Sequence, residues 1–288
     1  MHYRLIILDR NAWMYLDMVE QTIYMLDEAG HTAELVGYEP GLENTEVDRH
    51  VFFGTWYPTH NIPDGSVVTN FDHHTLVFQI LTDDVLRSCE IWDYSQRNVD
   101  LIKKRVPEAR CHLMELGYAP RLDFSHAYVE SEKNIDVLML GMATERRVRV
   151  LRALSELGIN TLIEYSKVGA ARADLIRRTR ILISIYGGED RECISSSRLA
   201  PVLATRGFVI TENCSDQTQN RKWVQYTVSV DYDQLVSTVL EWIGKPAERK
   251  MFADTAHERF QTEVRPFVHS EASTGDLPDH HRILVSDE

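Results

Sequence analysis

Short apolar runs alternate with stretches of helical period along most of the chain. Residues 3–8 (YRLIIL) and 135–140 (IDVLML) are apolar at successive positions, as in strands that are buried on both faces of a parallel sheet. Between residues 13 and 29 apolar residues recur at helical spacing, and Gly30 follows as a residue typical of a helix end. This alternation predicts parallel sheets with crossover helices.

The alternation falls into two series. Strands are expected in the first series at 3–8, 33–36, 51–53, 66–70, 89–93 and 112–115, and in the second at 135–140, 161–165, 181–185, 208–211 and 223–230. Helices are expected at 13–29, 95–105, 145–157, 170–179, 195–205, 232–242 and 247–260. Ser95 is the expected N-cap of the second of these helices.

The stretch between the series, residues 117–134, is polar and has no period, which is typical of an interdomain linker. The predicted fold class is therefore α/β, with two Rossmann-like doubly wound domains that face a central cleft. The expected divisions are an acceptor-side domain at 1–120, a linker at 121–133, a donor-side domain at 134–245, a closing helix at 246–269 and a loose acidic tail at 270–288. Ligands of open parallel sheets bind outside the carboxyl ends of the strands, so the chemistry is expected in the loops there.

Composition narrows the class of protein. The 288 residues include 31 Lys plus Arg against 44 Asp plus Glu, which gives a formal charge of −13. This charge opposes general attraction to nucleic acid or to an anionic membrane, but it is compatible with a local basic pocket. No apolar run is long enough to span a bilayer, and the four cysteines (Cys89, Cys111, Cys193 and Cys214) have no CxxC spacing. We expect a cytoplasmic protein with reduced thiols and without a metal site.

Two loops of the second series carry residues suited to a phosphate group. The first, GMATERR, follows the strand at 135–140 and offers Gly141 for close backbone approach, with Arg146 and Arg147 at the start of a helix. The second, residues 186–198 (YGGEDRECISSSR), begins at Tyr186 and ends in three serines and Arg198. A solvated arginine face and an ordinary capped helix are the alternative interpretations.

The first series offers a candidate base. In residues 70–74 (NFDHH), Asp72 is placed to deprotonate an acceptor hydroxyl, and His73 or His74 to orient it. An acid beside surface histidines is the alternative interpretation. Asp9 and Asn11 also follow a predicted strand, where they form either part of the cleft or an Asx turn.

Four segments in order between residues 66 and 216 resemble the GT-B glycosyltransferases, in particular a small bacterial and viral group related to the spore-maturation-type and group 1 transferases. The segments are residues 89–98 (CEIWDYSQRN), 116–120 (LGYAP), 136–147 (DVLMLGMATERR) and 197–212 (SRLAPVLATRGFVITE).

The resemblance implies a nucleotide-sugar donor, with UDP or GDP, in the second domain and an acceptor in the first. It places Arg198 at the donor diphosphate, Gly141 and Arg146 near the phosphates, and Glu212 beside the nucleoside or sugar. Such an enzyme stabilises the departing diphosphate with arginines and helix amides and requires no metal or other cofactor. The candidate catalytic residues are Asp72, His73 and Arg198. The candidate donor-binding residues are Gly141, Arg146, Tyr186, Ser195, Ser196, Arg198 and Glu212.

One departure from the family pattern keeps alternatives open. Ser195 stands where many relatives carry a Glu that contacts the donor, and Glu189 or Glu192 is a nearby substitute. The alternative function is a catalytically silent module that binds a nucleotide sugar or a partner. An enzyme that acts on nucleotides by hydride or phosphoryl transfer is disfavoured, because the sequence contains neither GxGxxG after its first strand nor GxxxxGK[ST]. The candidate acceptors are a glycan, a small molecule and a modified nucleic-acid base. The choice among them, the stereochemistry and the oligomeric state are left open.

Overall fold

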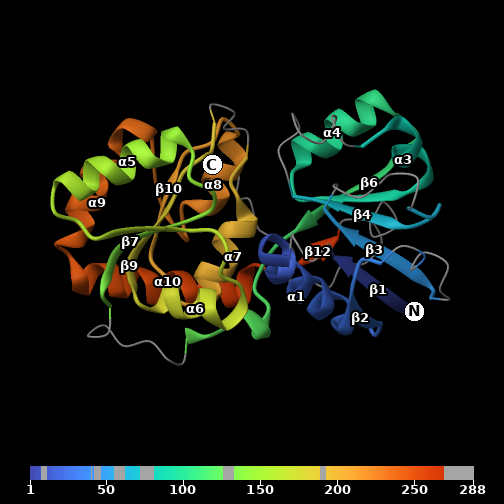
Figure 1. Ribbon diagram of the computed structural model, residues 1–288, viewed down its shortest axis with the longest axis horizontal. Coiled ribbons are helices and arrows are strands. Elements are labelled where there is room, and N and C mark those ends of the chain that lie inside the picture. The colour runs from blue at the N-terminus through green and yellow to red at the C-terminus, as the bar shows by residue number, and fades with distance from the viewer. Residues whose placement is uncertain are drawn as a thin grey trace, which may run out of the picture.

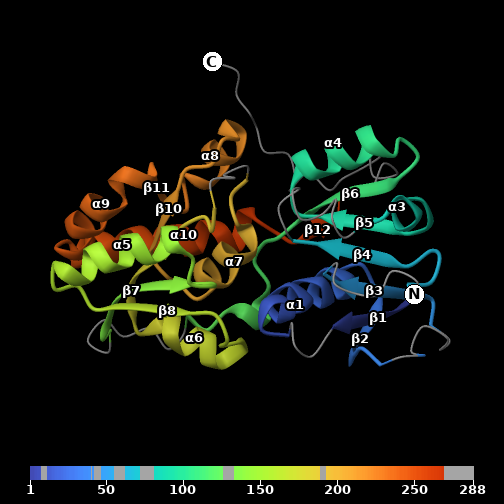
Figure 2. The same cartoon turned by 45° about the horizontal axis from the view of Figure 1, so that its top comes forward.

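A computed structural model describes residues 1–7, 12–39, 41, 47–54, 62–71, 81–125, 133–188 and 193–268 of the chain. It contains a seven-stranded and a five-stranded sheet, which form separate lobes (Figures 1 and 2). The lobe built on the seven-stranded sheet is called the first lobe, and the other the second lobe. The two parallel Rossmann-like sheets predicted from the sequence are confirmed.

The first lobe has strand order β12-β6-β5-β4-β3-β1-β2, and every pair is parallel except β12 with β6. Its strands are β1 (His2–Ile7), β2 (Thr32–Gly37), β3 (Arg49–Phe53), β4 (Val67–Asn70), β5 (Glu90–Asp93), β6 (Arg110–Glu115) and β12 (Phe267–Val268). Its helices are α1 (Ala12–Glu28), α3 (Asp83–Ser88) and α4 (Gln96–Arg105). Helix α1 covers one face of the sheet, and α3 and α4 cover the other (Figures 1 and 2).

Local sequence explains the ends of these helices. Gly30 adopts φ +74°, and the amide of His31 donates to the carbonyl of Leu26, which ends α1 where the sequence predicted. Ser95 occupies the N-cap position of α4, but its side chain makes no capping hydrogen bond. Its amide donates to Asp93 Oδ1 at 2.8 Å, so the predicted N-cap position of Ser95 is confirmed, although the side chain does not cap the helix.

The second lobe has strand order β11-β10-β9-β7-β8, all parallel, which is the flavodoxin-like order 2-1-3-4-5 within the lobe. Its strands are β7 (Ile135–Leu140), β8 (Thr161–Glu164), β9 (Thr179–Ser184), β10 (Val209–Glu212) and β11 (Val228–Val230). Its helices are α5 (Glu145–Glu156), α6 (Gly169–Arg177), α7 (Ser196–Ala204), α8 (Gln217–Trp223), the 3-10 turn η7 (Tyr232–Gln234), α9 (Leu235–Ile243) and α10 (Pro246–Glu263).

Two apolar layers enclose the second sheet. Residues of α5 and α9 pack with one face, and residues of α6 and α7 pack with the other. The sequence prediction of a strand at 223–230 is wrong for its first part, because α8 ends at Trp223 and β11 comprises only Val228–Val230. Asp216 caps α8 by accepting hydrogen bonds from the amides of Thr218 and Gln219, and this cap starts the helix.

The chain crosses between the lobes twice, and the crossings run side by side. The first passes Gly117, Tyr118 and η4 (Pro120–Leu122), and the second follows α10 through Val264 to β12. The amide of Tyr118 donates to the carbonyl of Val264 at 2.7 Å. A Cβ on Gly117 would lie 2.4 Å from the same carbonyl oxygen, so the approach requires glycine. Of the closing helix predicted at 246–269, α10 accounts for Pro246–Glu263, and β12 then returns the chain to the first sheet.

Two further properties concern the whole described chain. All four cysteines are buried and none forms a disulfide bond. Within the described ranges, no helix combines the length and the apolar character that a membrane crossing requires.

Candidate functional site

A cavity of about 210 Å³ lies between the two lobes, at the carboxyl ends of β7 and β8. The first lobe contributes Tyr15 and Met18 of α1 and Phe71 after β4. The second lobe contributes the ends of both strands and the starts of α5, α6 and α7. Because β7 pairs with β8 on one side and β9 on the other, the cavity lies at the point where the strand order reverses, which is the usual ligand site of such sheets.

Gly141 is the residue around which the cationic part of the site is built. It follows β7 with φ +135°, a backbone conformation that side chains disfavour. A Cβ at this position would lie 3.2 Å from Arg147 Nη1 and 3.5 Å from Arg198 Nη2. Glycine therefore allows two guanidinium groups, from α5 and α7, to approach the same backbone position.

Arg147 is fixed by the two loops on either side of it. Its Nε donates to the carbonyl of Ile185 and its Nη1 to the carbonyl of Met142, both at 2.9 Å. The side chain belongs to a residue only 8% exposed, and burial, followed by the charge of Arg146, lowers its pKa. The guanidinium group thus stays at the cavity wall without freedom to reorient.

Arg198 projects from the first turn of α7 and donates to Ser184 Oγ at 3.1 Å. Burial, followed by the charge of Arg147, lowers its pKa to about 9, and the guanidinium remains cationic at neutral pH. In the described part of the chain, neither Arg147 nor Arg198 forms an ion pair with a carboxylate. Two desolvated cations without a counterion favour the binding of an anion.

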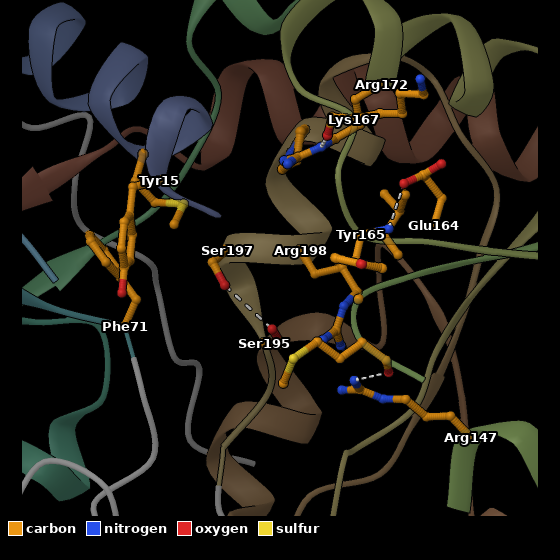
Figure 3. A pocket seen from close by; sticks show the side chains of 15 residues that line it. Tyr15, Phe71, Arg147, Glu164, Tyr165, Lys167, Arg172, Ser195, Ser197 and Arg198 are labelled. Carbon is orange, nitrogen blue, oxygen red and sulfur yellow. Dashed lines mark hydrogen bonds between the residues drawn. The ribbon is translucent and has the colours of Figure 1, made fainter. Parts of the chain in front are cut away.

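Figure 3 shows how the cavity wall is arranged around these cations. Arg147 and Arg198 lie together, Lys167 and Arg172 lie at another edge, and Tyr15 and Phe71 face them from the first lobe. Glu164, the last residue of β8, and Tyr165 complete the wall. The sequence predictions did not include Lys167, Arg172, Glu164 or Tyr165. Glu164, Tyr165 and Lys167 lie at or just after the end of β8, the strand next to β7, and this position is the signal that identifies them. Arg172 lies on α6 and has no such signal.

Arg146 and Glu212, both expected near the donor, bind each other. Arg146 makes a bidentate ion pair with Glu212, at 2.6 Å for Nη1 to Oε2, and its guanidinium lies 3.8 Å from the ring centroid of Tyr232. Glu212 is fully buried and also accepts from the amide of Tyr186 at 3.2 Å. Consecutive residues on a helix point in different directions, so Arg147 lines the cavity while Arg146 faces β10.

The serine-rich turn and Tyr186 contribute unequally to the cavity. Ser195 lines it, and Ser195 Oγ lies 3.4 Å from Ser197 Oγ, whereas Ser196 is buried. The amides of Ser196 and Arg198 donate to the carbonyls of Ile194 and Ser195. Tyr186 is 5% exposed and does not line the cavity, and burial raises its pKa. The positive charge at this wall therefore comes chiefly from guanidinium groups.

The candidate base and several alternatives fall outside the described residues. These are Asp9, Asn11, Asp72, His73, His74, Glu189 and Glu192. Phe71, which immediately precedes Asp72, does line the cavity.

The fully buried Asp93 joins the ends of β4 and β5. Its carboxylate accepts hydrogen bonds from Asn70 Nδ2 at 2.6 Å and from Asn98 Nδ2 at 3.0 Å.

A larger cavity of about 870 Å³ lies in the first lobe between the end of α1 and β12. Tyr3, Arg49 and Glu90 line it at the amino ends of their strands, away from the ends where ligands of parallel sheets bind. Arg49 pairs with Glu90 at 2.6 Å.

Among the described residues, no group of three His, Cys, Asp or Glu side chains could hold a metal ion.

Comparison with known proteins supports the fold assignment. No protein-family model matches the chain, and no curated protein matches its sequence. An α-glucosyltransferase in complex with UDP superposes with a TM-score of 0.64 at 11% identity, over 92% of this chain and 96% of that one. An α-glucosyltransferase in complex with UDP and a 13-mer DNA containing a central A:G mismatch gives 0.63 at 10% identity, over 92% and 96%. WaaG, a glycosyltransferase involved in lipopolysaccharide biosynthesis, gives 0.58 at 11% identity, over 91% and 95%.

The chain therefore has the fold of GT-B glycosyltransferases, as the sequence predicted. At these identities the likeness establishes the fold. Membership of the small bacterial and viral group stays a prediction.

Proposed function

We propose that the protein transfers a glycosyl group from a nucleoside diphosphate sugar to an acceptor that is not yet identified. The observation that carries this proposal is the convergence of Arg147 and Arg198 on Gly141, without a carboxylate partner in the described chain, at the point where the strand order reverses. The fold supports it, because the similar structures include transferases with bound UDP. UDP is accordingly the first nucleotide to test and GDP the second.

The proposed chemistry is stabilisation of the leaving group. When the bond between the anomeric carbon of the donor sugar and the diphosphate breaks, negative charge develops on the diphosphate. Arg147 and Arg198, which are held in place before the reaction, stabilise that charge without reorganisation and without a metal ion. Arg146 and Glu212 act indirectly in this proposal, because their ion pair holds the main chain at Tyr186.

The acceptor belongs to the first lobe in this proposal, which keeps the sequence division into an acceptor side at 1–120 and a donor side at 134–245. Tyr15 and Phe71 form its wall of the cavity, with ring centroids 6.0 Å apart. Asp72 is proposed to deprotonate the acceptor hydroxyl, with His73 orienting it. A nucleic-acid base is one acceptor class to test, because one similar structure contains DNA.

A donor panel tests the function. The purified protein is incubated with UDP-sugars and GDP-sugars, and release of free nucleotide is measured with and without acceptors that include sugars and DNA. The proposal requires binding of at least one donor and slow release of its nucleotide, both lost in Arg198→Ala. Binding without any release would favour the silent module, and absence of binding to every donor would refute the proposal.

A further inference from the structure

A buried ion pair joins the two lobes beside the cavity. Arg172 of α6 donates through Nη1 to Oδ2 of Asp17, which lies on α1 of the other lobe, 155 residues away in sequence. The side chain of Arg172 is 13% exposed and that of Asp17 is 4% exposed.

The same guanidinium group belongs to the cavity wall. Arg172 lines the cavity, and its Nε donates to the carbonyl of Lys167 at 2.8 Å. The charge of Arg172 contributes to lowering the pKa of Arg198, so the two cations act on each other across the site. On α1, Tyr15 and Met18 lie close to Asp17 in sequence and line the same cavity, and Figure 3 shows Tyr15 on the side opposite the cations.

The energetics of Asp17 depend on Arg172. Burial raises the pKa of Asp17, and the adjacent Arg172 charge opposes that shift. A buried carboxylate is tolerated only with such a partner. A guanidinium group has five N–H donors in one plane, so it can bind a carboxylate and an anion at the same time.

We propose that Asp17 is a positioning residue that orients Arg172 as a third cation for the anion bound in the cavity. The anion and Asp17 of α1 then bind the same guanidinium group. Binding of either one holds Arg172 in the orientation in which it binds the other. Because α1 carries Tyr15 and Met18, occupancy of the anion site is thereby coupled to the position of the first-lobe wall. The inference rests on the anion site of the proposed function.

A neighbouring pair provides the matched control. Glu20, also on α1, pairs with Arg121 at 3.3 Å, and these side chains are 32% and 66% exposed. Neither Glu20 nor Arg121 lines the cavity between the lobes. Glu20 and Arg121 do line a smaller cavity with Asp17 and Arg172, and the charge of Glu20 adds to the raised pKa of Asp17. Glu20→Gln therefore removes a negative charge from the same helix while it keeps the Asp17–Arg172 ion pair.

The test is a double-mutant cycle on binding. Dissociation constants for UDP and for inorganic pyrophosphate are measured calorimetrically for the wild type, Asp17→Asn, Arg172→Gln, the double variant and Glu20→Gln. We expect Asp17→Asn to weaken binding by about fivefold or more, a typical magnitude for coupling between sites. In the Arg172→Gln background the same change should have no further effect, and Glu20→Gln should bind as the wild type does.

Wild-type affinity in Asp17→Asn and Arg172→Gln, or tighter binding in Asp17→Asn, would overturn the inference. If Asp17→Asn does not fold, Arg172→Lys replaces it. Lysine keeps the charge beside Asp17 but lacks the planar set of donors, so weaker binding at an unchanged melting temperature supports the inference and unchanged binding overturns it. Failure of the wild type to bind either probe would instead refute the proposed function, and binding of pyrophosphate but not UDP would refute only the choice of nucleotide.

Discussion

Arg147 and Arg198 come from different helices and meet at Gly141, whose Cβ, if present, would lie 3.2 Å from one guanidinium group and 3.5 Å from the other. Burial lowers the pKa of both side chains, and the charge of Arg147 lowers the pKa of Arg198 as well, so holding two cations here costs free energy. Such an arrangement stabilises an anion more than it stabilises the fold.

Gly141→Ala should weaken UDP binding several-fold. The new methyl group contacts Arg147, and the positive φ of residue 141 adds a strain of about 1–3 kcal/mol. Gly158→Ala is the control, because Gly158 has φ +80° but no atom within 4 Å of its Cβ position. Both variants should melt earlier than the wild type, yet only Gly141→Ala should lose affinity in calorimetry. Equal affinities in the two variants would show that the contact with Arg147 is unimportant.

Glu212→Gln should destabilise the second lobe strongly. It leaves the buried Arg146 cation without the carboxylate that binds it bidentately, which typically costs about 3–5 kcal/mol. Glu241→Gln removes the partner of Lys245 from an exposed pair and should cost about 1 kcal/mol or less. Urea unfolding of both variants measures the difference. Similar losses in the two would contradict the structural role assigned to the Arg146–Glu212 pair.

Gly117→Ala should disrupt the side-by-side crossings between the lobes. Its Cβ would lie 2.4 Å from the Val264 carbonyl oxygen and 2.6 Å from the carbonyl carbon of Arg265, so backbone must move. Overpacking of this kind costs about 1–3 kcal/mol and should speed hydrogen exchange at the Tyr118 amide. At Gly244 an added Cβ would make an ordinary 3.7 Å contact, so Gly244→Ala should leave that exchange unchanged. Unchanged exchange in Gly117→Ala would refute the tight crossing.

Local patterns of apolar residues and glycine predicted part of the fold. Strands β7 and β9 are apolar runs because both faces of a parallel sheet are buried, and Gly30 marks the end of α1 because it supplies a positive φ. Helix α8 was missed because the apolar residues around 223–230 resemble a strand, although Asp216 is a sequence signal for its start. The two-residue strand β12 has no local sequence signal, because its pairing with β6 depends on the position of the end of α10.

The site was predictable to a similar extent. Gly141, Ser195 and Arg198 line the cavity because strand ends and helix starts meet at one edge of the sheet. The choice between Arg146 and Arg147 depends on the rotation of α5, which a short motif does not specify. The pairing of Asp17 with Arg172 arises only when the two lobes come together, so no local pattern indicates it.

The central claim is that Arg198 binds the donor diphosphate. Calorimetric titration of UDP into Arg198→Ala, with the exposed Arg152→Ala as control, tests it most directly. The account predicts that Arg198→Ala loses UDP affinity by at least about tenfold, because charged hydrogen bonds contribute about 1.5–3 kcal/mol. Its melting temperature should stay level or rise, since a repelling buried cation has been removed. Wild-type affinity for UDP in Arg198→Ala would contradict the account.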